Sequence, residues 1–110
     1  ATVREPDGLA MSSRNRYLSP AARTVASAIP AALEAGRVAG TAGAAGVVDA
    51  VRRHLDGVVT EVPMHIDYIE VRSNDLGPAP SHGEARLLAA VIVDGTRLLD
   101  NVAVTLGGPR

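Results

Sequence analysis

The sequence predicts an α+β fold in which helices are followed by a small, three-stranded, mostly antiparallel sheet. Helical periodicity fills the first half of the chain, and β-rich runs fill the second half from residue 64 onward. A chain of 110 residues with 46% hydrophobic content is long enough to bury the core of one domain unaided. Two tyrosines are the only aromatic residues, so the core must be built from Ala, Val, Leu and Ile.

Residues 1–18 are expected to form an extended lead-in and a polar loop. Pro6 keeps the residue before it out of the helical region, and Asp7-Gly8 is typical of a turn. The stretch "DGLAMSSRN" then ends in two hydroxyls, an arginine and an asparagine. Such a cluster of donors suits a phosphate group, but it is also what a loop that caps a helix looks like.

Residues 19–57 are expected to be helical, with a loose link, "AGTAG", between two helices. Ser19 is a natural N-cap, and Pro20 suits the first helical position. Pro30 deletes a backbone hydrogen bond and should kink or split the first helix. Gly57 is the expected stop of the helix over 44–56, in which Asp49 precedes two arginines at helical spacing, Arg52 and Arg53. The apolar residues that recur at helical spacing, and should be buried, are Leu18, Ala22, Val25, Ile29 and Leu33 in the first helix and Val47, Val48, Val51 and Leu55 in the second.

Residues 64–106 are expected to form the sheet. Its strands are "MHIDYIEVR", "RLLAAVIV" and "TRLLDNVAVTL", and Asp94-Gly95 between the last two is a strong hairpin signal. The run "RLLAAVIV" is apolar on both faces, which predicts the central strand.

Composition excludes several classes of function. The net charge is −1, and no basic run has interleaved aromatics, so neither nucleic acid nor an anionic membrane is an expected partner. The chain has no cysteine, which excludes disulfides and thiolate chemistry, and it has no long apolar span. We therefore expect a cytoplasmic protein.

No metal site is expected. The spacing of His54, His65 and His82 matches no ligand pair on a helix face or a hairpin. A serine nucleophile is equally unexpected, because Ser12 and Ser13 lie in no G-x-S-x-G elbow.

The strand carboxylates also argue against acid/base chemistry. Asp67 and Glu70 are expected to point to opposite faces of the sheet, so they should not form a paired acid/base site. We expect the strand carboxylates, among them Asp67, Glu70 and Asp100, to bind arginines such as Arg72, Arg86 or Arg97 or to cap the edge of the sheet instead.

The blocks "TVREPDGLAMSSRNRYLSP", "DYIEVRSNDLGP", "GEARLLAAVIV" and "TRLLDNVAV" resemble the pantothenate synthetase (pantoate–β-alanine ligase) family and cover nearly the whole chain. The resemblance implies an enzyme that condenses pantoate with β-alanine through pantoyl adenylate, with release of AMP and pyrophosphate from ATP. It also implies that residues 19–110 form a C-terminal lid domain and that residues 1–18 carry a loop corresponding to the KMSKS loop of class I synthetases.

The resemblance further implies that an N-terminal Rossmann-like domain, absent from this chain, carries an H-x-G-H motif and the pantoate and β-alanine pockets. The whole enzyme is expected to be a homodimer. Mg²⁺ is expected to accompany ATP, with its ligands outside this chain. The isolated domain is expected to be inactive.

Carried over position by position, the family's ATP-binding residues are Val3, Met11, Ser12, Ser13 and Arg14. Val3 matches a backbone contact near the adenine, and Ser12, Ser13 and Arg14 are the expected catalytic residues. Asn15 is assigned to holding the shape of the loop. Because the chain has no lysine, Arg14 must supply the positive charge. The alternative is a non-catalytic binding or oligomerisation module in which the loop only caps a helix.

Overall fold

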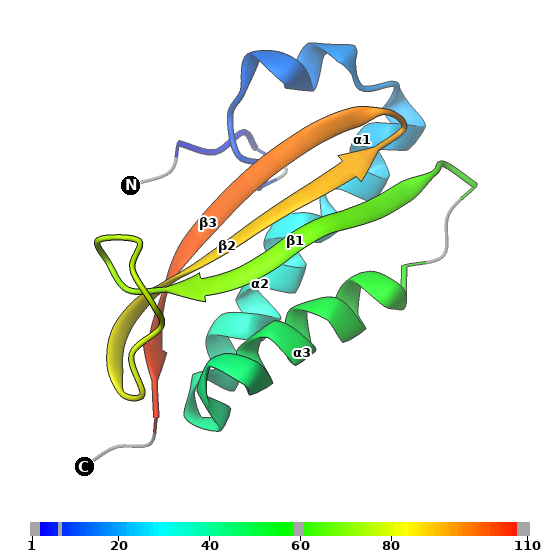
Figure 1. Cartoon of the computed structure of the whole chain (residues 1–110). Coiled ribbons are helices and arrows are strands. Elements are labelled where there is room, and N and C mark those ends of the chain that lie inside the picture. The colour runs from blue at the N-terminus through cyan, green and yellow to red at the C-terminus, as the bar shows by residue number, and fades with distance from the viewer. Residues whose placement is uncertain (1–2, 7, 59–60, 108–110) are drawn as a thin grey trace.

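Three helices pack on one face of a three-stranded sheet (Figure 1). The computed structural model describes residues 3–6, 8–58 and 61–107. The elements follow the order η1 (Ser13–Tyr17), α1 (Pro20–Ala26), α2 (Ala28–Val38), η2 (Ala39–Ala42), α3 (Gly43–Asp56), β1 (Met64–Arg72), β2 (Gly83–Val93) and β3 (Thr96–Leu106), where η marks a 3₁₀ helix. The predicted α+β class is confirmed.

The first predicted helix is split in two, as Pro30 requires. The hydroxyl of Ser19 caps α1 by accepting the Ala22 N–H at 3.1 Å. Pro30 is the third residue of α2, within the first turn, where a backbone N–H needs no intrahelical partner. Its ring would clash with the carbonyl four residues earlier, on Ala26, and α1 ends at that residue.

The predicted apolar stripes form the core between the helices and the sheet. Ala22, Val25, Ile29, Leu33, Val47, Val51 and Leu55 are buried, whereas Leu18 and Val48 are only partly covered. The sheet contributes the inward-facing side chains of β2, among them Leu87, Val91 and Val93. No helix in the described part of the chain has the length and apolar character needed to cross a membrane.

Both strand pairs of the sheet are antiparallel, and β2 is central, as predicted. Val93 and Thr96 face each other across a two-residue turn in which Asp94 has φ 49° and Gly95 has φ 82°. Positive φ at both positions is typical of the type I′ hairpin turn that the Asp-Gly pair predicts.

The first strand, β1, contains a β-bulge that was not predicted from the sequence. Ile66 lies opposite Val91 and Tyr68 lies opposite Ala90, so Asp67 is an extra residue in β1. Before the bulge the even-numbered residues face the helices, and after it the odd-numbered residues do. Asp67 and Glu70 therefore both point to the face away from the helices, and the expectation that they lie on opposite faces was wrong.

The region between α2 and α3 passes close to the end of β3. Gly107 donates its N–H to the carbonyl oxygen of Gly40 at 3.0 Å. Gly40 is buried, and a Cβ atom built on it would overlap the carbonyl oxygen of Thr105. Residues 39–42, expected to be loose, instead form the 3₁₀ helix η2 against this strand.

Candidate functional site

The N-terminal segment folds back on itself as a short hairpin made of residues 3–6 and 8–11. Glu5 donates its N–H to the carbonyl of Leu9 at 2.9 Å, and Met11 donates its N–H to the carbonyl of Val3 at 2.8 Å. The side chains of Val3 and Met11 are 65% and 59% exposed. The hairpin thus places two exposed apolar side chains next to each other where the polar loop begins.

The turn of this N-terminal hairpin depends on a glycine. Gly8 has φ 86° and donates its N–H to the carbonyl of Glu5 at 2.8 Å. A Cβ on Gly8 would lie 3.6 Å from Pro30, so the turn rests on α2. Asp7, the other half of the predicted turn, lies outside the described residues.

Residues 11–14, which we call loop 11–14, join the N-terminal hairpin to η1 and include the first two residues of that 3₁₀ helix. The hydroxyl of Ser12 accepts the N–H of Arg14 at 3.2 Å and thereby caps η1. The hydroxyl proton of Ser12 stays available to an acceptor, and Ser13 is exposed. Ser12 therefore serves as the cap that the alternative interpretation requires, without losing its capacity to donate to an anion.

Arg14 presents most of its guanidinium to solvent. Its Nη1 atom donates to the backbone carbonyl of Arg97 at 3.4 Å, at the start of β3. Among the described residues no carboxylate forms an ion pair with it, so most of its five N–H donors remain available. Arg16 lies nearby with its guanidinium 5.0 Å from the Tyr17 ring centroid.

Asn15 is buried directly after loop 11–14 and fixes the loop to the N-terminal hairpin through hydrogen bonds. It is 5% exposed, and its Nδ2 atom donates to the carbonyl of Ala10 at 2.9 Å and also to the Glu5 carboxylate. This arrangement agrees with the shape-holding role expected for Asn15. The predicted site residues, Val3, Met11, Ser12, Ser13 and Arg14, thus lie together on one exposed loop and its base.

Sequence reasoning expected Asp100 to bind an arginine or cap the sheet edge, but it did not identify the contacts that attach the N-terminal hairpin to the rest of the domain. Arg4 makes two bonds to the Asp100 carboxylate, at 2.7 and 2.9 Å, and Arg23 binds the Glu5 carboxylate. The hydrogen bond with Asp100 raises the pKa of Arg4 above its already high ordinary value. The available signal was Asp100 itself, a charged residue at an inward-facing position between two inward-facing apolar residues, Leu98 and Val102.

Two further strand carboxylates, Asp67 and Glu70, bind arginines, as predicted. Asp67 accepts a hydrogen bond from Arg97 Nε at 2.9 Å, and Glu70 lies 3.0 Å from Arg72. The described residues contain no cluster of three or more histidines and carboxylates that could hold a metal ion.

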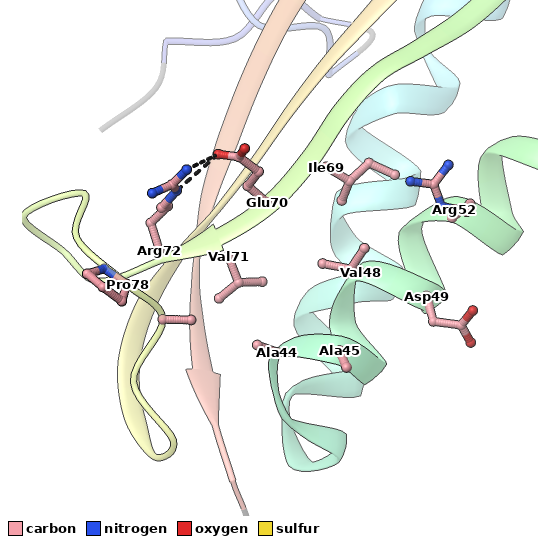
Figure 2. Close-up of a pocket in the computed structure, with 11 residues that line it drawn as sticks. Ala44, Ala45, Val48, Asp49, Arg52, Ile69, Glu70, Val71, Arg72 and Pro78 are labelled. Carbon is pink, nitrogen blue, oxygen red and sulfur yellow. Dashed lines mark hydrogen bonds and ion pairs between the residues drawn. The ribbon is translucent and has the colours of Figure 1, made fainter.

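A hollow of about 620 Å³ lies between α3 and the edge strand β1 (Figure 2). Val48, Ile69 and Val71 form its apolar lining, and Glu70 and Arg72 at its border are paired with each other. It contains none of the predicted site residues. Loop 11–14 is the stronger candidate because most donors of its exposed hydroxyls and of the Arg14 guanidinium have no partner among the described residues.

Comparison with known proteins gives one consistent result. The family model described as Pantoate-beta-alanine ligase matches residues 1–103. A pantothenate synthetase of Nocardia farcinica is 57% identical over 108 residues, which cover 98% of this chain and 33% of that protein. A pantothenate synthetase of Mycolicibacterium smegmatis is 52% identical over 107 residues, or 96% of this chain and 33% of that protein.

Solved structures agree with the sequence relatives. The crystal structure of pantothenate synthetase from Thermus thermophilus matches with a TM-score of 0.77 and 38% identity, covering 92% of this chain and 37% of that one. The chain spans about a third of the length of the curated relatives that it matches. High identity over almost all of this chain, together with the shared fold, establishes that it belongs to the pantoate–β-alanine ligase family.

Proposed function

We propose that this chain is the C-terminal lid domain of an ATP-dependent pantoate–β-alanine ligase and that loop 11–14 binds the phosphates of ATP. The observation that carries the proposal is the loop itself. Two serine hydroxyls and a guanidinium without a carboxylate partner in the described chain lie on a loop held by the N-terminal hairpin. Donors of this kind form charge-assisted hydrogen bonds with phosphate oxygens.

The proposed reaction has two steps. A carboxylate oxygen of pantoate forms a bond to the α-phosphorus of ATP, and the bond from that phosphorus to the bridging oxygen of the β-phosphate breaks. Pyrophosphate leaves with the electron pair, and pantoyl adenylate remains. The amine of β-alanine then attacks the acyl carbon, AMP leaves, and the amine loses its proton.

Loop 11–14 would act in the first step. Negative charge grows on the β- and γ-phosphates as pyrophosphate leaves, so contacts from Arg14 strengthen as the transition state forms. The Ser12 and Ser13 hydroxyls would donate to phosphate oxygens. Val3 and Met11 would form the side of the site nearer the adenine, where the Val3 carbonyl retains a second lone pair beyond the one used by Met11.

Mg²⁺ is expected with the nucleotide, but loop 11–14 does not fit it as a ligand set. The loop offers hydroxyls and a guanidinium and no carboxylate, and the described residues hold no metal-ligand cluster. We assign no step to the metal. The pantoate and β-alanine pockets, the homodimer and the cytoplasmic location are proposed for the longer protein.

The test is Arg14→Ala in the full-length gene product that contains this chain. We expect the rate of pantoyl adenylate formation, measured by rapid quench, to fall by about 10²–10³-fold, since that is the range for removing one such donor. KM for β-alanine should scarcely change, because β-alanine enters in the second step. Arg14→Lys should give an intermediate rate, since it keeps the charge and loses the bidentate geometry.

The alternative, in which the loop is only a helix cap, predicts a different result. Arg14→Ala would then lower thermal stability and leave single-turnover adenylation nearly intact. A rate within about threefold of wild type in a folded Arg14→Ala enzyme would refute the assigned role.

A further inference from the structure

Asp100 is an anomaly in the inner face of the sheet. It lies on β3 at an inward-facing position between Leu98 and Val102, and its side chain is 2% exposed. A carboxylate taken out of water is costly unless it is paired and hydrogen-bonded. The N–H of Asn101 supplies one bond to Asp100 Oδ1 at 2.7 Å, so a cation must supply the rest.

That cation is Arg4, from the first arm of the N-terminal hairpin. The two residues are 96 positions apart, and both terminal nitrogens of Arg4 bind the two oxygens of Asp100. Nη1 of Arg4 also donates to the carbonyl of Gly8 at 3.0 Å. One guanidinium therefore links the first arm of the hairpin, its turn and the middle of β3.

The opposite side of the N-terminal hairpin is attached to the helices. The Glu5 carboxylate accepts hydrogen bonds from Asn15 in η1 and from Arg23 in α1. Because Arg4 and Glu5 are adjacent, their contacts hold the hairpin from two directions. Loop 11–14 starts at the open end of that hairpin, where Met11 is bonded to Val3.

We propose that Arg4 and Asp100 are positioning residues for the adenylation step: their ion pair sets where loop 11–14 meets the phosphates of ATP. This inference rests on the proposed function. Neither residue touches the reacting atoms, and they act through the hairpin. Displacing a catalytic group by about 1 Å can cost about 10²-fold in rate, so a loosened hairpin should slow adenylation well beyond its effect on folding.

The decisive variant is Asp100→Asn in the full-length gene product. It keeps the size of the side chain but removes the charge and one acceptor for Arg4. We expect adenylate formation to slow by about tenfold or more, with a higher KM for ATP, for the same reason of geometry. The second step, started from supplied pantoyl adenylate and β-alanine, should keep its wild-type rate.

Val104→Ala is the matched control. Val104 is buried on the same face of β3, and its apolar side chain takes no part in the hydrogen bonds that hold the N-terminal hairpin, so its truncation lowers stability through the core alone. In folded enzyme it should leave both steps unchanged. Hydrogen exchange at the Met11 amide gives a readout independent of activity: protection should fall in Asp100→Asn and persist in Val104→Ala.

If Asp100→Asn does not fold, Arg4→Lys replaces it, because lysine keeps the charge and loses the bidentate contact. Equal adenylation rates and equal Met11 protection in wild type and the pair variants would overturn the positioning role while leaving the ligase proposal standing. A wild-type protein without ATP-dependent adenylation would overturn the proposed function. Loss of both reaction steps in equal measure would mark the pair as merely structural and so would also overturn the inference.

Discussion

Met11 donates its backbone N–H to the carbonyl oxygen of Val3 at 2.8 Å, and this bond closes the N-terminal hairpin at the point where loop 11–14 begins. The loop is therefore anchored at its first residue by the hairpin and at its far end by the buried Asn15. Between these anchors the hydroxyls and the Arg14 guanidinium face solvent. These donors are therefore accessible to a ligand while the backbone on either side of them is held in place.

The 110-residue chain by itself should bind ATP with a Kd in the millimolar range or weaker. One loop of phosphate contacts must offset the full cost of ordering the nucleotide. We also expect no pantothenate to form from ATP, pantoate and β-alanine. Isothermal titration and a product assay measure these two properties, and micromolar affinity or turnover would contradict the two-domain interpretation.

Gly40→Ala should destabilise the domain by about 1–3 kcal/mol or more, as overpacking at a site with no room does. The new Cβ would overlap the backbone carbonyl of Thr105, and a backbone atom cannot move aside as a flexible side chain can. Urea unfolding gives the free energy of unfolding. Gly57→Ala is the control, since Gly57 has φ −79° and a Cβ there makes only ordinary 3.5 Å contacts; we expect no loss from it.

Gly95→Ala should cost about 1–2 kcal/mol, the usual penalty for placing an L side chain in the left-handed region. The space around Gly95 is open, so the cost comes from φ 82° alone. Asp94→Asn, at φ 49°, should be neutral or slightly stabilising, because asparagine is favoured in this turn type. Denaturation midpoints that move equally in both variants would argue against this explanation.

The carboxyl of Asp75 should titrate below its ordinary pKa of about 3.9. The Ser73 hydroxyl, and then the Gly77 N–H, donate hydrogen bonds that stabilise its charged form and lower its pKa. This contribution to stability is present above the ordinary pKa and is lost as the pH falls through the lowered value. An NMR titration measures the shift, and Ser73→Ala should move the pKa of Asp75 back up.

Local signals predicted most of the fold because they act within a few residues. Ser19 and Pro20 set the start of α1, Pro30 sets the break before α2, and Asp94-Gly95 sets the hairpin. The helix start, the helix break and the hairpin turn each depend on backbone geometry that the residue type restricts directly. The sequence alone is therefore enough to predict them.

The missed features depend on partners that are distant in the chain. The bulge at Asp67 exists only relative to β2, and the Arg4–Asp100 pair joins residues 96 positions apart. Loop 11–14 could be located from its sequence, but what holds it could not. The charged Asp100, at an inward-facing position between apolar residues, indicated that a buried partner was needed. It did not indicate which arginine would bind it.

The bulge in β1 determines where a one-residue gap should fall when this strand is aligned with a shorter strand of a relative. Because Ile66 and Tyr68 face consecutive residues of β2, removing Asp67 alone would leave every remaining pair in place and give an unbroken inward–outward alternation. Removing His65 or Ile69 instead would shift part of the strand out of phase with its core. An alignment of this strand with a relative one residue shorter should therefore place its gap at Asp67.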